Sequence, residues 1–160
     1  MSKILVVCAF SGTGKTEMAR QTPGLVDLDS SLFGNQEGWI ERYLRALLFR
    51  YYHGEAVFAS THPQVIAGLA YAQVPVLLAY PDPSLKAEYE RRYIARAGSG
   101  GLMQQDESWF ARRMMALWDQ AQSDMASAPC TTRIVLQSGQ YLSDRIAYSP
   151  VSGFVDRSKG

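Results

Sequence analysis

Short apolar runs recur along the chain and alternate with longer segments whose apolar residues are spaced three or four positions apart. The runs have the length of buried strands, and the longer segments have the periodicity of amphipathic helices. Strands that alternate with helices are typical of a parallel sheet with helices on both faces. We therefore expect a three-layer α/β domain with a five-stranded parallel sheet, its strands at 4–7, 25–29, 56–59, 74–80 and 133–137.

Helices are expected between these strands, at 17–21, 39–49, 63–72, 84–97 and 107–125, with a short last helix after residue 138. Pro63 suits the first position of its helix, and Ser84 is expected to cap the next one. The helix at 107–125 directs one apolar row toward the core, made of Phe110, Met114, Leu117, Trp118, Ala121 and Met125.

Length and composition fit one globular domain. The 160 residues suit a single core, which we expect to span 1–148, with a small helical lid at about 84–104. Residues 149–160 are polar, with two glycines and a proline, and predict a tail that is loose or lies along the surface. There is no apolar run long enough to cross a membrane and no cleavable signal, which predicts a cytoplasmic protein. Cys8 and Cys130 are expected to be small buried residues and not a disulfide or a zinc site.

The first expected strand leads into the sequence AFSGTGKT, from Ala9 to Thr16. A strand, a glycine-containing loop, Gly-Lys-Thr and a helix form the arrangement of a phosphate-binding P-loop. Glycines let the backbone curl so that several amides point at one anion, although Ala9 departs from the usual first glycine. The predicted nucleotide-binding residues here are Ser11, Gly12, Thr13, Gly14, Lys15 and Thr16. Lys15 would reach the phosphates of ATP, and the Thr16 hydroxyl would ligate Mg²⁺.

Two acids, Asp27 and Asp29, close the second expected strand. Alternate residues of a strand point the same way, so both carboxylates are expected to face the loop. Phosphoryl transfer to an alcohol needs a group that accepts the hydroxyl proton and a group that holds Mg²⁺. We assign the first role to Asp29 and the second to Asp27. The alternative is a pair of solvated acids at a strand end, followed by a capping Ser30.

Arginines follow the fourth strand. Arg92 and Arg96 are four apart and share a helix face, which predicts a lid that closes on the transferred phosphoryl group. The Gly98-Ser99-Gly100-Gly101 run would be its hinge. The alternative is a solvated helix face with Glu88 and Glu90 as salt-bridge partners. Two further residues, Arg112 and Arg113, are expected at the surface, where they could steer a polyanion.

Other residues at the strand ends leave two interpretations open. Ser138, Gly139 and Gln140 either contact the nucleotide base or form a plain turn. His62 either faces the acceptor or caps the helix that begins at Pro63. Trp39 either stacks on an acceptor base or belongs to the core; Tyr43 is expected in the core, and His53 at the surface.

With AFSGTGKT, VDLDSSLFG, VFASTH, the lid arginines and LQSGQYLSD in place, the chain resembles a family of small phage P-loop kinases, over roughly residues 3–147. These resemble nucleoside monophosphate kinases in architecture, and the family we suspect is the 5-hydroxymethyluridine DNA kinases. The resemblance implies ATP and Mg²⁺ as cofactors, Lys15 and Thr16 in the nucleotide site, and Asp27 with Asp29 in the acidic site. It implies a hydroxymethylated thymine in phage DNA as the acceptor, and the host cytoplasm as the compartment.

The net charge of +1 excludes a basic nucleic-acid binder, so any contact with DNA must come from a local cluster. A base in duplex DNA would have to be flipped out or taken single-stranded. Two other functions stay open: a kinase of free deoxynucleoside monophosphates, and a nucleotide-binding module without catalysis. The missing Asn-Lys-x-Asp motif argues against a GTPase switch.

Overall fold

A sheet of five parallel strands forms the centre of the computed structural model, which describes residues 3–34, 36–99 and 104–159. The strands lie in the order β2-β3-β1-β4-β5, so the expected α/β fold with a five-stranded parallel sheet is confirmed. Their bounds are Val6–Ala9 (β1), Leu25–Asp27 (β2), Ala56–Ala59 (β3), Val76–Pro81 (β4) and Thr132–Leu136 (β5). The first strand is central and pairs with β3 on one side and β4 on the other.

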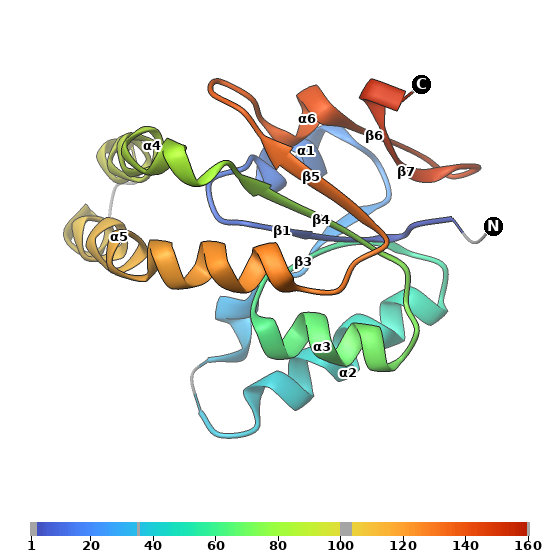
Figure 1. Cartoon of the computed structure of the whole chain (residues 1–160). Helices are drawn as coiled ribbons and strands as arrows, with labels where there is room; N and C mark the ends of the chain where they lie inside the picture. Colours follow the sequence, from blue (N-terminus) through green and yellow to red (C-terminus); the bar gives the residue numbers. More distant parts are fainter. Residues whose placement is uncertain (1–2, 35, 100–103, 160) are drawn as a thin grey trace.

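Helices cover both faces of the sheet (Figure 1). On one face lie α1 (Lys15–Gln21) and the short α6 (Leu142–Arg145). On the other lie α2 (Trp39–Tyr52) and α3 (Pro63–Tyr71). The pair formed by α4 (Lys86–Ser99) and α5 (Gln104–Ser127) extends past the edge toward which β1 runs. Short 3-10 turns are η1 (Ser30–Phe33), η2 (Pro83–Leu85) and η4 (Arg157–Lys159).

Alternate residues of β1 belong to the two cores. Val6 and Cys8 pack into the core on the side of α2 and α3, whereas Val7 and Ala9 pack into the core on the side of α1. A strand covered on both faces is apolar at every position, and that is why the short runs identify the strands from sequence. The carboxyl ends of the strands gather at one edge, where ligands bind in folds of this kind.

The C-terminal segment is more ordered than its polar composition predicts. An antiparallel hairpin forms from β6 (Ile146–Ser149) and β7 (Gly153–Asp156). Phe154 is only 2% exposed, and its ring centroid lies 5.5 Å from that of Phe58. The Phe154 amide also donates to the carbonyl of Ile4, at 2.8 Å. Two apolar residues, Ile146 and Phe154, therefore hold the hairpin against the α1 face of the sheet.

Three smaller expectations were wrong. Asp82, not Ser84, caps the turn before α4, because the Asp82 carboxylate accepts hydrogen bonds from both the amide and the hydroxyl of Ser84. Leu117 is 46% exposed, whereas Trp118 and Met125 of the same helix are buried. Cys130 is only partly buried and lies before β5, and both cysteines are free.

Within the described part of the chain, every helix is too short or too polar to cross a membrane.

Candidate active site

The loop between β1 and α1 is curled by two glycines in the left-handed region. Gly12 has a φ of +86° and Gly14 a φ of +96°, which other residues rarely adopt. A Cβ added at Gly12 would lie 3.0 Å from the Tyr93 ring. Within the loop, the buried Thr13 hydroxyl donates to the carbonyl of Phe10 at 2.6 Å. The backbone thus has the curl that a phosphate-binding loop requires, and its role in binding phosphate remains a prediction from the sequence.

Lys15 begins α1 and is partly buried. Burial lowers the pKa of this lysine below its ordinary value of 10.5. The carboxylates of Asp27 and Asp29 act in the opposite direction, and the positive charge of Arg96 lowers the pKa further. Lys15 therefore lies within electrostatic reach of all three residues, as expected for a shared site.

The hydroxyl of Thr16 donates to the carboxylate of Asp27, with Oγ1 and Oδ2 at 3.0 Å. This contact joins the start of α1 to the last residue of β2. A hydroxyl beside a carboxylate is a pair of hard oxygen ligands of the kind that Mg²⁺ prefers. The described residues contain no group of three or more metal-binding side chains. A magnesium ion here would therefore take its remaining ligands from phosphate oxygens and water.

Asp29 is placed differently from the expectation. Only Asp27 belongs to the strand; Asp29 follows it, exposed, as the N-cap of η1, and its Oδ1 accepts from the amide of Ser31 at 2.9 Å. The strand alternation therefore does not orient both acids. What brings Asp29 near Lys15 is the turn after β2. Oδ1 serves the cap, which leaves Oδ2 of the same carboxylate to accept a proton.

Tyr43 fixes the distance between two strand ends. Its hydroxyl donates to the carbonyl of Leu28 at 2.8 Å and accepts from the amide of Ser60 at 2.9 Å. These groups follow β2 and β3. The side chain is fully buried, as expected for a core residue. Tyr43 therefore holds the segment that carries Asp27 and Asp29 next to the end of β3.

His62 caps α3, because its Nδ1 accepts from the amide of Gln64 at 3.2 Å. The ring lies edge to face with Trp39, with centroids 5.4 Å apart. Burial lowers the pKa of His62, which keeps the ring neutral near pH 7. The capping interpretation is thus confirmed. Trp39 is half-buried and packs against both His62 and the core.

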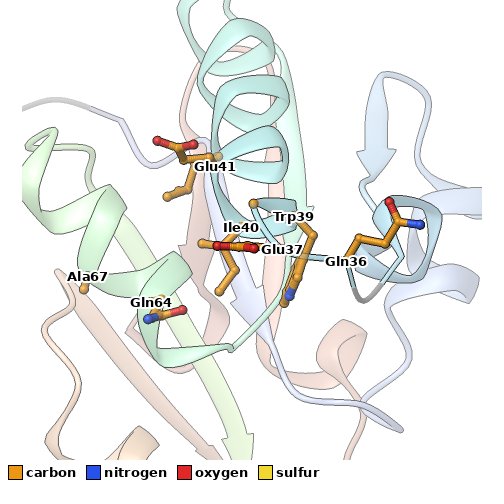
Figure 2. A pocket seen from close by; sticks show the side chains of 9 residues that line it. Gln36, Glu37, Trp39, Ile40, Glu41, Gln64 and Ala67 are labelled. Atoms are coloured by element: carbon orange, nitrogen blue, oxygen red, sulfur yellow. The ribbon is translucent and has the colours of Figure 1, made fainter.

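An open groove of about 750 Å³ lies between the start of α2 and α3 (Figure 2). Trp39 and Ile40 line it from α2, and Gln64 lines it from α3. Two carboxylates, Glu37 and Glu41, also line it, and its described lining includes no cation and no residue of the 9–16 loop. The negative charge of the groove therefore disfavours phosphate groups.

Arg92 is bound by protein groups on several sides. Its guanidinium donates to the carbonyl of Gly12 at 2.8 Å and to that of Gln140 at 3.0 Å. It also lies 4.4 Å from the ring centroid of Tyr89 and 4.0 Å from that of Tyr141. The arginine thus joins α4 to the glycine loop and to the segment after β5. In this state it acts as a clamp, and closing on a phosphoryl group would require it to leave these partners.

Glu88 completes the clamp from the preceding turn of α4. Its carboxylate pairs with Arg92 at 3.1 Å, so the Glu88 salt bridge of the solvated-face alternative forms, although on a largely buried pair and not a solvated face. It also accepts from the Gly139 amide at 2.9 Å and from the Ser138 hydroxyl at 2.6 Å. These hydrogen bonds, that of Gly139 first, hold the pKa of Glu88 below its ordinary value. The segment expected to contact the base is therefore fixed by Glu88, and Gln140 contributes a carbonyl to the clamp.

Of the two lid arginines, Arg96 is the one whose charge acts on Lys15. Gly98 and Ser99 belong to the end of α4, whereas Gly100 and Gly101 lie outside the described residues, so the hinge remains a prediction. Arg112 and Arg113 are exposed as expected, and the guanidinium of Arg113 lies 5.4 Å from the Trp109 ring centroid.

Sequence reasoning missed the tyrosines that surround the loop. The Tyr93 hydroxyl donates to the carbonyl of Ser11 at 2.9 Å, and Tyr89 lies against Arg92. One signal was present: Tyr89 and Tyr93 share a face of α4 at the same spacing as Glu88 and Arg92. Tyr141 gave no such signal, because only the fold brings it beside Gly14.

Comparison of the chain with models of protein families, with curated proteins and with solved structures gave no match.

Proposed function

We propose that this chain is an ATP-dependent kinase that transfers the γ-phosphoryl group to a hydroxyl acceptor. The observation that carries the proposal is the contact of the Thr16 hydroxyl with the Asp27 carboxylate, beside the partly buried Lys15. A loop with two left-handed glycines precedes these groups. In P-loop enzymes a lysine, a threonine and an acid in this relation hold a nucleotide triphosphate and its metal.

The residues present fit the group that this function requires. The partly buried ammonium of Lys15 can pair with an anion, and Thr16 with Asp27 offers oxygen ligands for Mg²⁺. When bound, ATP with Mg²⁺ supplies the transferable phosphoryl group and part of the charge neutralisation. Lys15 would hold phosphate oxygens, and Arg96 would add positive charge from α4.

Asp29 would accept the proton of the acceptor hydroxyl. The turn after β2 brings it within electrostatic reach of Lys15, and only one of its carboxylate oxygens accepts from the Ser31 amide. As the alcohol oxygen forms its bond to the γ-phosphorus, the bond between that phosphorus and the bridging oxygen breaks, and the hydroxyl proton passes to Asp29. The chain thereby needs no covalent intermediate of its own.

The acceptor that we propose is the 5-hydroxymethyl group of 5-hydroxymethyluracil in DNA, a step of thymidine hypermodification. This rests on the resemblance carried by the glycine loop, the acidic VDLDSS segment and the LQSGQYLSD segment. A free deoxynucleoside monophosphate is the second candidate, and the net charge of +1 favours it.

The test is transfer of label from [γ-³²P]ATP to four acceptors: DNA that contains 5-hydroxymethyluracil, the same DNA with thymine, free 5-hydroxymethyldeoxyuridine, and a panel of deoxynucleoside monophosphates. Label on modified DNA and not on thymine DNA supports the proposal. Label on monophosphates alone supports the second candidate. ATP binding without transfer to any acceptor would make the chain a non-catalytic nucleotide-binding module.

A further inference from the structure

The outward face of α2 carries arginine and aromatic side chains in one row. Arg42, Arg45, Phe49 and Tyr52 are separated by three, four and three positions, so they share a helix face. All four are exposed in the structure, Phe49 to 63% and Tyr52 to 68%. We call these four residues the α2 stripe.

The positive charges of the α2 stripe are not neutralised by carboxylates. Among the residues that the structure describes, the Arg42 guanidinium donates to two carbonyls, that of Phe33 at 3.3 Å and that of Glu37 at 3.4 Å. Within the described part of the chain, no ion pair joins Arg42 or Arg45 to an acid. By contrast Arg50, which lies off the stripe, pairs with Glu55 at 3.2 Å. Glu41 lies four positions before Arg45 on the same helix without an ion pair to it, so both guanidinium groups of the stripe can still meet an anion.

The aromatic rings of the α2 stripe are open to a stacking partner. The Phe49 ring contacts the His53 ring, with centroids 4.2 Å apart and planes tilted by 36°, yet more than half of Phe49 is exposed. The Tyr52 ring lies edge to face with the Tyr51 ring, with centroids 5.2 Å apart. Exposed rings next to cations suit single-stranded nucleic acid, whose bases stack on aromatic side chains while its phosphates meet arginines.

The stripe begins next to the segment that follows Asp29. Through its bond to the Phe33 carbonyl, Arg42 is tied to the chain between Asp29 and α2. The groove on the neighbouring side of α2 carries Glu37 and Glu41 and would repel phosphates (Figure 2). A polyanion that reaches Asp29 along α2 would therefore lie on the stripe and not in the groove.

We propose that the α2 stripe binds a single strand of nucleic acid and delivers its base to Asp29. The inference deepens the proposed function, on which it rests for the identity of the reacting base. Its physical basis is the match between two unneutralised guanidinium groups and two open rings on the protein, and the phosphates and bases of the strand.

Binding is measured by fluorescence anisotropy with a labelled oligothymidylate and with the same strand containing 5-hydroxymethyluracil, over a range of salt concentrations. The variants Phe49→Ala and Tyr52→Ala are each expected to weaken binding about tenfold. Arg45→Gln is expected to reduce the slope of log K against log salt by about 0.7. Matched controls are Tyr71→Ala, on a still more exposed tyrosine at the end of α3, and Arg91→Gln, on an exposed arginine of α4. Circular dichroism checks that every variant is folded.

The proposal is overturned if the stripe variants bind as tightly as the unmodified protein, or if the controls weaken binding to the same extent. Sedimentation velocity tests a second copy of the chain as the occupant. Self-association that the stripe variants abolish, with unchanged DNA affinity, would assign the face to a dimer and overturn the proposal.

Failure of this inference can be told apart from failure of the proposed function. If no acceptor is phosphorylated, the kinase proposal fails, and the anisotropy series still decides whether the stripe binds DNA. If modified DNA is phosphorylated, the stripe variants should raise KM for the oligonucleotide about tenfold and leave turnover of free 5-hydroxymethyldeoxyuridine unchanged. An unchanged KM for the oligonucleotide would overturn the stripe and leave the kinase standing.

Discussion

Thr16 and Asp27 are in direct contact, with the threonine Oγ1 3.0 Å from the carboxylate Oδ2. The residues are 11 positions apart in sequence, and the crossover from α1 to β2 brings them together. The contact links the helix that follows the glycine loop to the acidic edge of the sheet, and most of the predictions below depend on it.

Replacement of Asp27 by Asn keeps an oxygen that can accept from Thr16 and removes the negative charge. If this pair holds Mg²⁺, the variant should need about 10- to 100-fold more magnesium for half-maximal nucleotide binding. Titration of a fluorescent ATP analogue with Mg²⁺ measures this. An unchanged requirement would show that Asp27 is structural. Asp156→Asn, at the C-terminal hairpin, is the control.

Replacement of Asp29 by Asn separates its capping of the η1 turn from its proposed role as proton acceptor. Asn caps turns as well as Asp does, so the bond to the Ser31 amide and the melting temperature should be retained. Loss of the proton acceptor should lower kcat by about 10²- to 10⁴-fold. The measurement is steady-state phosphoryl transfer with whichever acceptor is labelled. Turnover within a few fold of the unmodified protein would contradict the assignment.

Arg92→Lys should destabilise the fold. Lysine keeps one charge but cannot reach the Gly12 and Gln140 carbonyls and the Glu88 carboxylate together. Loss of two charge-assisted hydrogen bonds should cost roughly 2–3 kcal/mol of the free energy of unfolding. Urea denaturation measures it, with the exposed neighbour Arg91→Lys as the control. Equal stability of the two variants would mean that the clamp contributes nothing.

Gly12→Ala and Gly24→Ala form a matched pair, because the two glycines have φ values of +86° and +88°. Left-handed strain alone should cost each variant about 1–2 kcal/mol. An added Cβ at Gly12 would also meet the buried Tyr89 and Tyr93 rings, whereas at Gly24 it meets nothing within 4 Å. Gly12→Ala should therefore be less stable by a further 1–3 kcal/mol or so. Thermal unfolding of both variants gives the difference, and equal costs would contradict the packing of the loop against α4.

Lys15 should make triphosphate binding depend on pH. In the ligand-free fold burial holds the pKa of Lys15 below 10.5, and a bound anion should raise it again. Between these two pKa values the free protein has lost the proton and the complex holds it, so binding should take up a proton. Over the same range the unfolded chain keeps its proton, so the ligand-free fold should gain stability as pH rises toward 10.5.

Isothermal titration calorimetry in alkaline buffers of different ionisation enthalpy measures this proton uptake. Lys15→Met keeps the length of the side chain and removes the titrating group, so its uptake should vanish. If Lys15→Met takes up as many protons as the unmodified protein, another group is responsible.

The sheet was predictable because each central strand is covered on both faces. Val6 and Val7 point in opposite directions and are both fully buried, so the run is apolar without interruption. The C-terminal hairpin was not predictable from composition, because it buries few residues on one side. Phe154 is the main anchor, set among Ser, Gly, Asp and Lys residues.

The candidate site was predictable where its residues are close in sequence. Lys15 and Thr16 follow the loop glycines directly, and Asp27 ends the next strand. The role of Arg92 was not predictable, because its partners Gly12 and Gln140 lie 80 and 48 positions away in the sequence. Helical spacing showed which residues share a face with Arg92 but not which loops that face would meet.

The hairpin of β6 and β7 also constrains how the protein is made. It covers Phe58 and pairs with Ile4, so a late segment of this sequence completes a layer begun by an early one. A nascent chain emerges N-terminus first, so the Phe58 side of the sheet stays exposed until the hairpin has been made. A chain that stops before residue 146 would leave this apolar face of the sheet exposed, and chaperones bind such surfaces.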